Sequence, residues 1–204
     1  MKQIKSQKIS RMVLFAILAA IVVVMSITPL GYFKAGIIEI SFLTIPVTIG
    51  AILMGPAGGA ALGFVFGLTS FSQCFGISAF GAVLLGINPF YTFILCVVPR
   101  TLMGLLTGLI FKWIAKADKT KVVSYAVASI SGAILNTILF MITLVLCFYN
   151  AEYIQGIVTS LGATNVFSFM ALFAGFNSIL EAIVAFLVSF PVTKAVARYS
   201  KKLV

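Results

Sequence analysis

The sequence contains no histidine and only four acidic residues, against 14 Lys and Arg, so its formal net charge is +10. Without histidine, the chain lacks the commonest metal ligand and the commonest acid–base catalyst. Its cysteines, Cys74, Cys96 and Cys147, are odd in number and widely spaced, which indicates neither a disulfide framework nor a zinc site. A GxxxxGK[ST] phosphate-binding loop is also missing. We therefore expect no enzyme activity, no ATP hydrolysis, no cofactor and no metal site.

Charged residues make up only 9% of the chain and hydrophobic residues 62%, a composition typical of an integral membrane protein. Basic residues in short loops stay on the cytoplasmic side of a membrane. Twelve of the 14 basic residues form three clusters: Lys2, Lys5, Lys8 and Arg11; Lys112, Lys116, Lys119 and Lys121; and Lys194, Arg198, Lys201 and Lys202. The clusters predict a cytoplasmic N-terminus, mid-chain loop and C-terminus, with the lipid bilayer and not nucleic acid as the partner of the positive charge.

Long apolar segments separate the basic clusters and predict six membrane-spanning helices. These are Met12–Ile27, Ile37–Met54, Ala57–Phe71, Tyr91–Trp113, Val122–Tyr149 and Val166–Val196. The first is interpreted as a retained helix and not a cleaved signal peptide, because no small-residue cleavage site leads into polar sequence. Six spans return the chain to its starting side. The predicted fold is an all-α membrane protein, with residues 1–204 forming one six-helix bundle.

The segment Ser72–Phe90 has no charge but contains Gly76, Gly81, Gly86 and Pro89. Irregular backbone is costly when it is exposed to lipid, so protein should cover such a segment. We expect it to form a lid or a partly re-entrant segment over the outer mouth of the bundle. The alternative is a disordered apolar loop in solvent.

Small residues recur at four-residue spacing on three of the predicted helices, which is the pattern that permits close helix approach. They are Gly59, Gly63 and Gly67; Gly104 and Gly108; and Ala16 and Ala20. For the glycines of Ala57–Phe71 we expect packing inside the bundle. For Ala16 and Ala20 the sequence leaves two options, internal packing or docking on another protein.

Two charged residues, Arg100 and Glu181, fall well inside the predicted spans, at a depth similar to that of Asn136 and Asn177. Counted at 1.5 Å per residue from the nearest basic anchor, all four lie roughly 18–25 Å above the inner edge. Polar groups at this depth are costly unless they are paired or face a wet cavity, so they indicate a binding site. The alternative is an Arg100–Glu181 ion pair that only joins two helices.

Polar and aromatic residues near the outer mouth, among them Gln73, Asn88 and Tyr91, are candidates for orienting a bound molecule. Each is equally consistent with an interfacial belt residue. Pro99 precedes Arg100, breaks the predicted helix there and frees the carbonyl of Leu95 for a ligand or a neighbouring group.

Three stretches, SITPLGYF, IPVTIGAILMGPAGGAALGFVFGLTS and VVPRTLMG, resemble the substrate-binding S components of energy-coupling factor transporters. The resemblance covers most of the chain and is greatest to the pantothenate branch. It implies a prokaryotic multi-pass cell-membrane protein that binds a vitamin in an outward-facing pocket. It also implies a transmembrane scaffold subunit, on which Ala16 and Ala20 dock, and two ABC-type ATPases that supply energy.

Arg100 would then take a carboxylate, and Asn136, Asn177 and Glu181 would take hydroxyl and amide groups. If Glu181 neutralises Arg100, another vitamin that is neutral or cationic fits equally well. Two other classes of protein remain open. One is an autonomous carrier or small channel that is coupled to protons through Glu181, and the other is a structural membrane subunit without a ligand.

Overall fold

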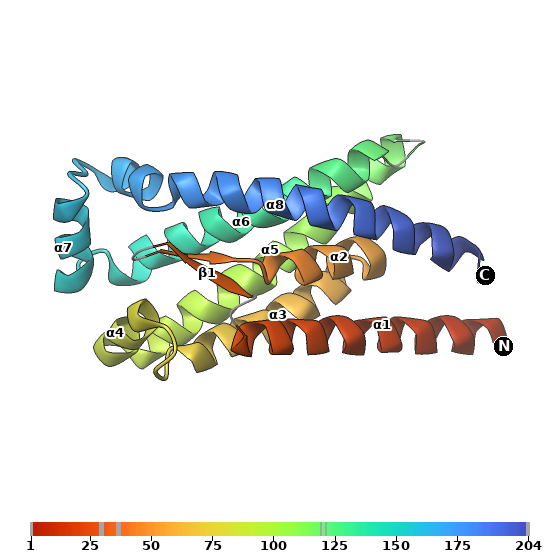
Figure 1. Cartoon of the computed structure of the whole chain (residues 1–204), viewed down its shortest axis with the longest axis horizontal. Helices are drawn as coiled ribbons and strands as arrows, with labels where there is room; N and C mark the ends of the chain where they lie inside the picture. The colour runs from red at the N-terminus through yellow and green to blue at the C-terminus, as the bar shows by residue number, and fades with distance from the viewer. Residues whose placement is uncertain (1, 29–30, 36–37, 119, 121, 203–204) are drawn as a thin grey trace.

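The computed structural model describes residues 2–28, 31–35, 38–118, 120 and 122–202, with the side chains of 2–8, 33–35, 38–40, 176–177 and 198–202 outside this description. These residues form eight helices and one two-stranded hairpin (Figure 1). The elements are α1 (Lys2–Ile27), β1 (Tyr32–Ala35), β2 (Ile38–Ser41), α2 (Thr44–Met54), α3 (Pro56–Gln73), α4 (Ala79–Ile87), α5 (Pro89–Ala117), α6 (Val122–Phe148), α7 (Glu152–Ser160) and α8 (Val166–Lys202).

The long helices run side by side, and the start of α1 and the end of α8 lie at the same end of the bundle, while α4 and α7 lie at the other (Figure 1). The end of α5 and the start of α6 are also on the side of the two chain ends. Since the described residues of the three basic clusters belong to these segments, they gather at one end of the molecule. This arrangement agrees with the separation of charge that the sequence predicts.

Within the described part of the chain, four helical segments are long and apolar enough to cross a membrane: Ile9–Ile27, Pro89–Ala117, Val122–Phe148 and Ser178–Ala197. The predicted second and third spans correspond to the shorter helices α2 and α3, which meet at Gly55 and Pro56. Gly55 has φ 85°, a conformation that a residue with a side chain rarely adopts, and Pro56 occupies the first turn of α3. At 1.5 Å per residue, α2 is roughly 16 Å long, about half of a hydrocarbon core.

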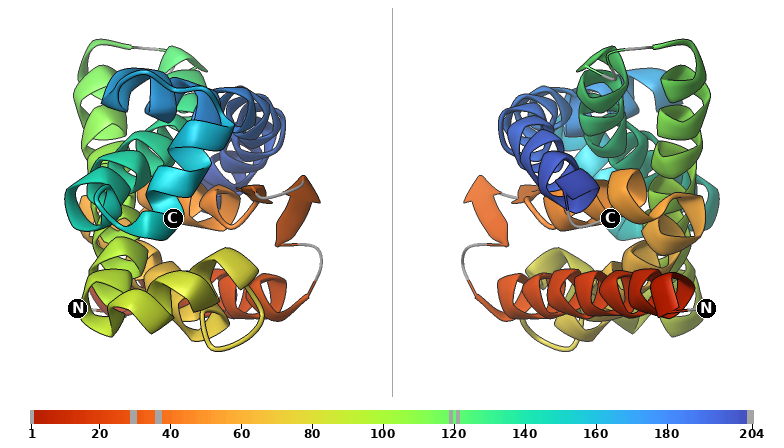
Figure 2. Two further views of the ribbon diagram at one scale, coloured as in Figure 1. Left: turned by 90° about the vertical axis from the view of Figure 1, so that its left-hand side faces the viewer. Right: turned by 90° about the vertical axis from the view of Figure 1, so that its right-hand side faces the viewer.

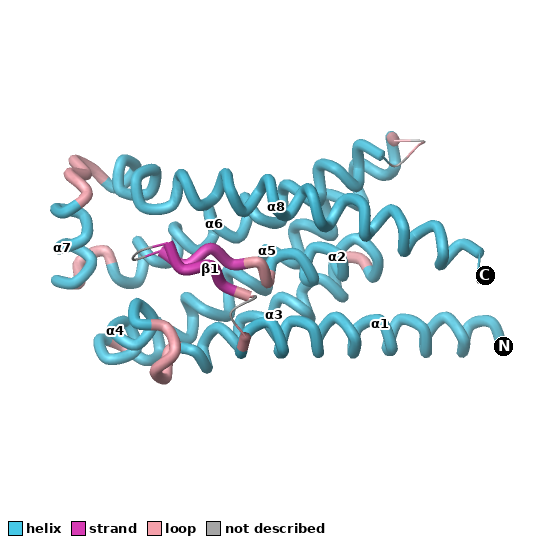
Figure 3. The backbone as a smooth tube through the Cα atoms, in the orientation of Figure 1, coloured by secondary structure: helices cyan, strands magenta, loops and turns pink. Residues whose placement is uncertain are grey.

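The predicted helix Ile37–Met54 is wrong at its start, because α2 begins at Thr44. Residues 38–41 instead form β2, which pairs antiparallel with β1 so that Tyr32 lies opposite Ser41 (Figure 3); Ile37 is outside the described residues. The segment Ile38–Ser41 alternates apolar and polar residues, which is a strand pattern. Pro46 falls in the first turn of α2, where its missing N–H requires no partner. A helix that started earlier would place this proline in its interior.

The prediction that Ser72–Phe90 lacks regular structure is also wrong, because Ala79–Ile87 forms helix α4. Ser78 caps this helix by accepting a hydrogen bond from the N–H of Gly81 at 3.2 Å. Asn88 then caps α5, since its side chain accepts from the N–H groups of Phe90 and Tyr91. Of the four predicted breaks, Gly76 lies in the turn before α4, with φ 125°.

The predicted internal packing of the glycine strip is confirmed. Gly59 lies against the carbonyl of Gly104, Gly63 against the carbonyl of Arg100, and Gly67 against the backbone of Val97. A side chain at any of these glycines would collide with the backbone of α5. The two helices therefore touch through their backbones, and this contact sets the position of Arg100.

Helix α1 runs along one edge of the bundle in both end-on views (Figure 2). Leu18 and Val22 bury its inner face with residues of α2 and α3. Ala16 and Ala20 lie on its exposed side. The outer face of α1 is therefore open to lipid or to another protein.

Candidate functional site

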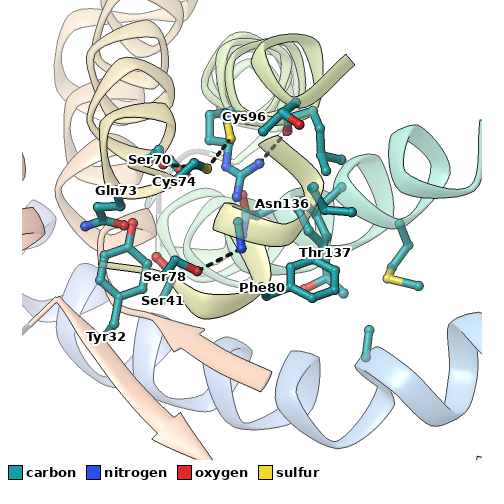
Figure 4. Close-up of a pocket in the computed structure, with 18 of the residues that line it drawn as sticks. Tyr32, Ser41, Ser70, Gln73, Cys74, Ser78, Phe80, Cys96, Asn136 and Thr137 are labelled. Carbon is teal, nitrogen blue, oxygen red and sulfur yellow. Dashed lines mark hydrogen bonds between the residues drawn. The ribbon is translucent and has the colours of Figure 1, made fainter. Parts of the chain in front are cut away.

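A cavity lies where the hairpin, α3, α4, α5, α6 and α8 meet (Figure 4). About 140 Å³ of it is open to the centre of a water molecule, far above the ~10–15 Å³ that one bound water requires. Its polar lining comprises Tyr32, Ser41, Ser70, Gln73, Ser78, Thr92, Arg100, Asn136, Thr137 and Glu181, together with the thiols of Cys74 and Cys96. Aromatic and aliphatic side chains, such as Phe80 and Phe140, form the rest of the wall. The space suits a small molecule with both polar and apolar parts.

Arg100 enters the cavity from α5 and is held on two sides. Its Nη1 donates to the carbonyl oxygen of Leu95 at 2.6 Å. Its guanidinium carbon lies 4.9 Å from the ring centroid of Phe140 and 5.5 Å from that of Phe66. Its buried Nε has no hydrogen-bond partner among the described residues. The guanidinium is therefore fixed in place with donor capacity left for a bound molecule.

The carbonyl of Leu95 is available because Pro99, four residues further on, has no N–H to bond it. The sequence predicts this free carbonyl correctly, but α5 continues through Pro99 to Ala117, so the predicted break is wrong. The group that takes the carbonyl is the side chain of Arg100. The proline thus supplies a backbone acceptor that orients the neighbouring cation.

Glu181 of α8 is 6% exposed and is also anchored on one side. Its Oε1 accepts a hydrogen bond from the backbone N–H of Ser41 at 2.7 Å, which ties the end of β2 to α8. Its Oε2 has no partner among the described residues, and neither has the Oδ1 of Asn136, which is 6% exposed. Buried acceptors without partners are unfavourable. These two acceptor oxygens therefore require hydrogen-bond donors from a ligand or from water.

Arg100 and Glu181, both described by the structure, line the same cavity but do not form a salt bridge. Each has its own neighbouring anchor, the carbonyl of Leu95 for Arg100 and the N–H of Ser41 for Glu181. The described contacts therefore give no support to the alternative, a direct ion pair that only joins two helices. The two charged side chains place a donor group and an acceptor group in the wall of one cavity.

The other predicted site residues have different positions. Gln73 lines the cavity, and its Nε2 donates to the carbonyl of Ser26, which links α3 to α1. Asn88 and Tyr91 are not among the described lining residues: Asn88 caps α5, and Tyr91 is 42% exposed and packs edge-on against Phe148. The side chain of Asn177 lies outside the described part of the structure.

Sequence reasoning missed several hydroxyl and thiol groups of the wall, among them Ser41, Ser70, Ser78, Thr92, Thr137 and Cys96. Such side chains usually bond the backbone of their own helix, as Thr92 does with the carbonyl of Asn88 at 2.9 Å. Their presence in an apolar segment therefore carries no signal of a site. The role of Ser41 cannot be predicted without the hairpin, because Ser41 bonds Glu181 through its backbone N–H and not through its side chain.

The described residues contain no group of three or more His, Cys, Asp or Glu that could hold a metal ion. A guanidinium, a carboxylate and an amide are instead set into a largely apolar enclosure. Such an arrangement binds and orients a small polar molecule through hydrogen bonds and charge.

A family model described as "ECF transporter, substrate-specific component" matches residues 10–193, nearly the whole chain. No curated protein matches the chain. The apolar helices and the cavity fit a membrane subunit that binds a substrate. The chain therefore belongs to the substrate-specific components of energy-coupling factor (ECF) transporters, the membrane subunits that bind the transported substrate and work with the components of an ECF module.

Proposed function

We propose that this chain captures pantothenate in the cavity between the hairpin and helices α3, α4, α5, α6 and α8. Pantothenate is a small anion with one carboxylate and with hydroxyl and amide groups. The observation that carries the proposal is that Arg100, Glu181 and Asn136 line one cavity and that each has a buried polar atom without a described partner: Nε of Arg100, Oε2 of Glu181 and Oδ1 of Asn136. Arg100 takes the carboxylate, and Glu181 and Asn136 accept hydrogen bonds from hydroxyl and amide N–H groups.

In this proposal the chain crosses the cell membrane of a prokaryote six times, with α2 and α3 as the two short spans. The basic end of the bundle, which holds the start of α1 and the end of α8, faces the cytoplasm. The cavity lies toward the end that carries α4 and α7, and it opens outward. A transmembrane scaffold subunit and two ABC-type ATPases supply the energy for uptake.

The presence of Glu181 beside Arg100 supports a second candidate, an S component for a different vitamin. A carboxylate in the same cavity offsets the positive charge of the guanidinium, which lowers the preference for an anion. A neutral or cationic vitamin that donates hydrogen bonds to Glu181 satisfies the same wall.

Calorimetric titration of the purified chain with pantothenate, and separately with thiamine, biotin and riboflavin, distinguishes these candidates. We expect saturable binding of pantothenate and none of the other three. Arg100→Lys keeps the charge but loses the planar fork of donors, so it should weaken pantothenate binding about 5- to 150-fold, or about 1–3 kcal/mol. Lys112→Ala, at an exposed position of the same helix, is the control and should bind normally. Binding of another vitamin in place of pantothenate would reject the assignment.

A further inference from the structure

Two thiols face each other in the wall of the cavity, and the proposed function does not use them. The Sγ atoms of Cys74 and Cys96 are 3.8 Å apart (Figure 4). Cys74 is 4% exposed and Cys96 is 6% exposed, and both line the cavity. Cys74 belongs to the C-terminal end of α3, whereas Cys96 lies in α5. The third cysteine, Cys147, is on α6 and is not among the described lining residues.

The spacing of the two thiols is suited to bond formation. A disulfide has an S–S length of about 2.05 Å, so the two sulfurs must approach by roughly 1.8 Å. Cys74 is the residue at which α3 ends, and the turn with Gly76 follows directly. Cys96 is held in place, since its carbonyl lies against Gly67 in the contact between α3 and α5.

A small oxidant can reach both sulfurs because they border the cavity, unlike thiols that are enclosed in a hydrophobic core. Cys74 also lies against Gly81 of α4, so the pair is next to a helix that lines the same cavity. Residues 75–95, including all of α4, connect the two cysteines. A bond between them would close this segment into a covalent loop.

We propose that Cys74 and Cys96 are a reversible modification site, which a hydroperoxide oxidises to an intrachain disulfide. One thiol attacks the peroxide oxygen, which yields a sulfenic acid and, from hydrogen peroxide, one water. The second thiol then attacks the sulfenic sulfur, and a second water leaves as the S–S bond forms. Two thiols lose two electrons and two protons in total, and the peroxide is reduced to two waters.

The disulfide ties the end of α3 to α5 and fixes both ends of the α4 segment. Because this link shortens the loops available to the unfolded chain, it should also raise the midpoint of thermal unfolding. A dithiol reductant reverses both effects. Formation of the disulfide depends on the geometry of the two thiols alone, whereas its response to a ligand rests on the proposed function.

The test treats the purified unaltered chain with hydrogen peroxide, alkylates the remaining thiols and maps the cysteines by mass spectrometry of unreduced peptides. We expect the peptides of Cys74 and Cys96 to be joined, with Cys147 alkylated, and the link to disappear after reduction. Cys96→Ser is the matched control, because it keeps two thiols, Cys74 and Cys147, and should form no intrachain link. Alkylation of both Cys74 and Cys96 after peroxide treatment, or an equally fast link in Cys96→Ser, would overturn the proposal.

Repeating the oxidation with saturating pantothenate separates the two proposals. A molecule in the cavity blocks the approach of peroxide, so it should slow formation of the Cys74–Cys96 link. If the link forms at the same rate with and without pantothenate, the ligand assignment fails while the redox pair stands. If no link forms in either sample, the redox pair fails and the ligand assignment is unaffected.

Discussion

At the scale of single residues, each of the two charged side chains of the site has one atom hydrogen-bonded to the protein and another atom without a protein partner. Arg100 donates from Nη1 to the carbonyl of Leu95, while its Nε has no partner among the described residues. Glu181 accepts from the N–H of Ser41 with Oε1, while its Oε2 has no described partner. A side chain that is anchored at one atom loses less conformational entropy when a ligand binds its other atom. The anchors therefore pre-organise the cavity for a polar molecule.

The anchoring role and the binding role of Glu181 can be separated by two substitutions. Glu181→Gln keeps an oxygen that accepts from Ser41 but removes the charge, so it should weaken ligand binding with little change in thermal stability. Glu181→Ala leaves the buried N–H of Ser41 without its partner, and it should cost about 1–3 kcal/mol of folding stability in addition. Thermal unfolding and calorimetric binding of pantothenate, measured on both variants, check this expectation.

The double variant Arg100→Ala/Glu181→Ala controls for an ion pair between the two residues. Removing both partners of a buried pair restores stability that single removal loses. Because no salt bridge joins these residues, the double variant should be no more stable than Glu181→Ala. Recovery to the stability of the unaltered chain would contradict the separate anchors.

The sequence predicts much of the polar wall, because charged residues are so rare inside apolar spans that their depth can be counted from the basic clusters. Arg100, Asn136 and Glu181 reach one cavity, and Gln73 reaches it as well. The prediction that Asn88 orients a bound molecule is wrong, because Asn88 caps α5. Asn before Pro at the start of a helix is a recognisable cap signal. Whether a side chain caps a helix or faces a cavity depends on where the helix begins, and boundaries are the least certain part of a sequence-based prediction.

At the scale of elements, the long helices are predictable and the short ones are not. Five predicted spans have close counterparts, such as Val122–Tyr149 and α6, which ends at Phe148. The hairpin, α4 and α7 are too short for a periodic pattern to stand out in an apolar sequence. Their stability comes from contacts with other elements, for instance the bond from Ser41 to Glu181, 140 residues away.

The contact between α3 and α5 links the packing of the bundle to the site. Gly63 touches the backbone carbonyl of Arg100, so a large side chain there must push α5 away. We expect Gly63→Leu to lower folding stability by about 1–3 kcal/mol through overpacking. We also expect it to weaken pantothenate binding, because Arg100 moves with the backbone of α5. Thermal unfolding and calorimetry measure the two effects.

The control for this variant is Ala61→Leu, which adds a leucine at an exposed position of the same helix two residues earlier. It should change neither stability nor binding by a measurable amount. Gly63→Leu with unaltered pantothenate affinity would show that the position of Arg100 does not depend on this contact.

At the scale of the whole molecule, the cavity and the outer face of α1 are separate surfaces. The cavity is formed by the hairpin and α3, α4, α5, α6 and α8, whereas α1 lies at the edge of the bundle (Figure 2). Leu18 and Val22 hold α1 on its inner side, which leaves Ala16 and Ala20 outward. A change on the outer face of α1 can therefore affect a partner without changing the site.

This separation leads to a prediction about Ala16→Trp and Ala20→Trp. Small residues allow the backbones of two membrane helices to approach closely, and an indole ring prevents that approach. Each variant should bind pantothenate as the unaltered chain does, whereas uptake by cells that also contain the scaffold subunit and both ATPases should fall.

Ile17→Trp is the matched control, because Ile17 is also exposed (52%) but lies outside the four-residue repeat. This variant should leave both binding and uptake unchanged. Paired measurements of binding and uptake on all three variants decide the matter. Loss of binding together with uptake would mean that Ala16 and Ala20 support the bundle itself, and equal loss of uptake in Ile17→Trp would mean that the effect comes from added bulk and not from the small-residue pair.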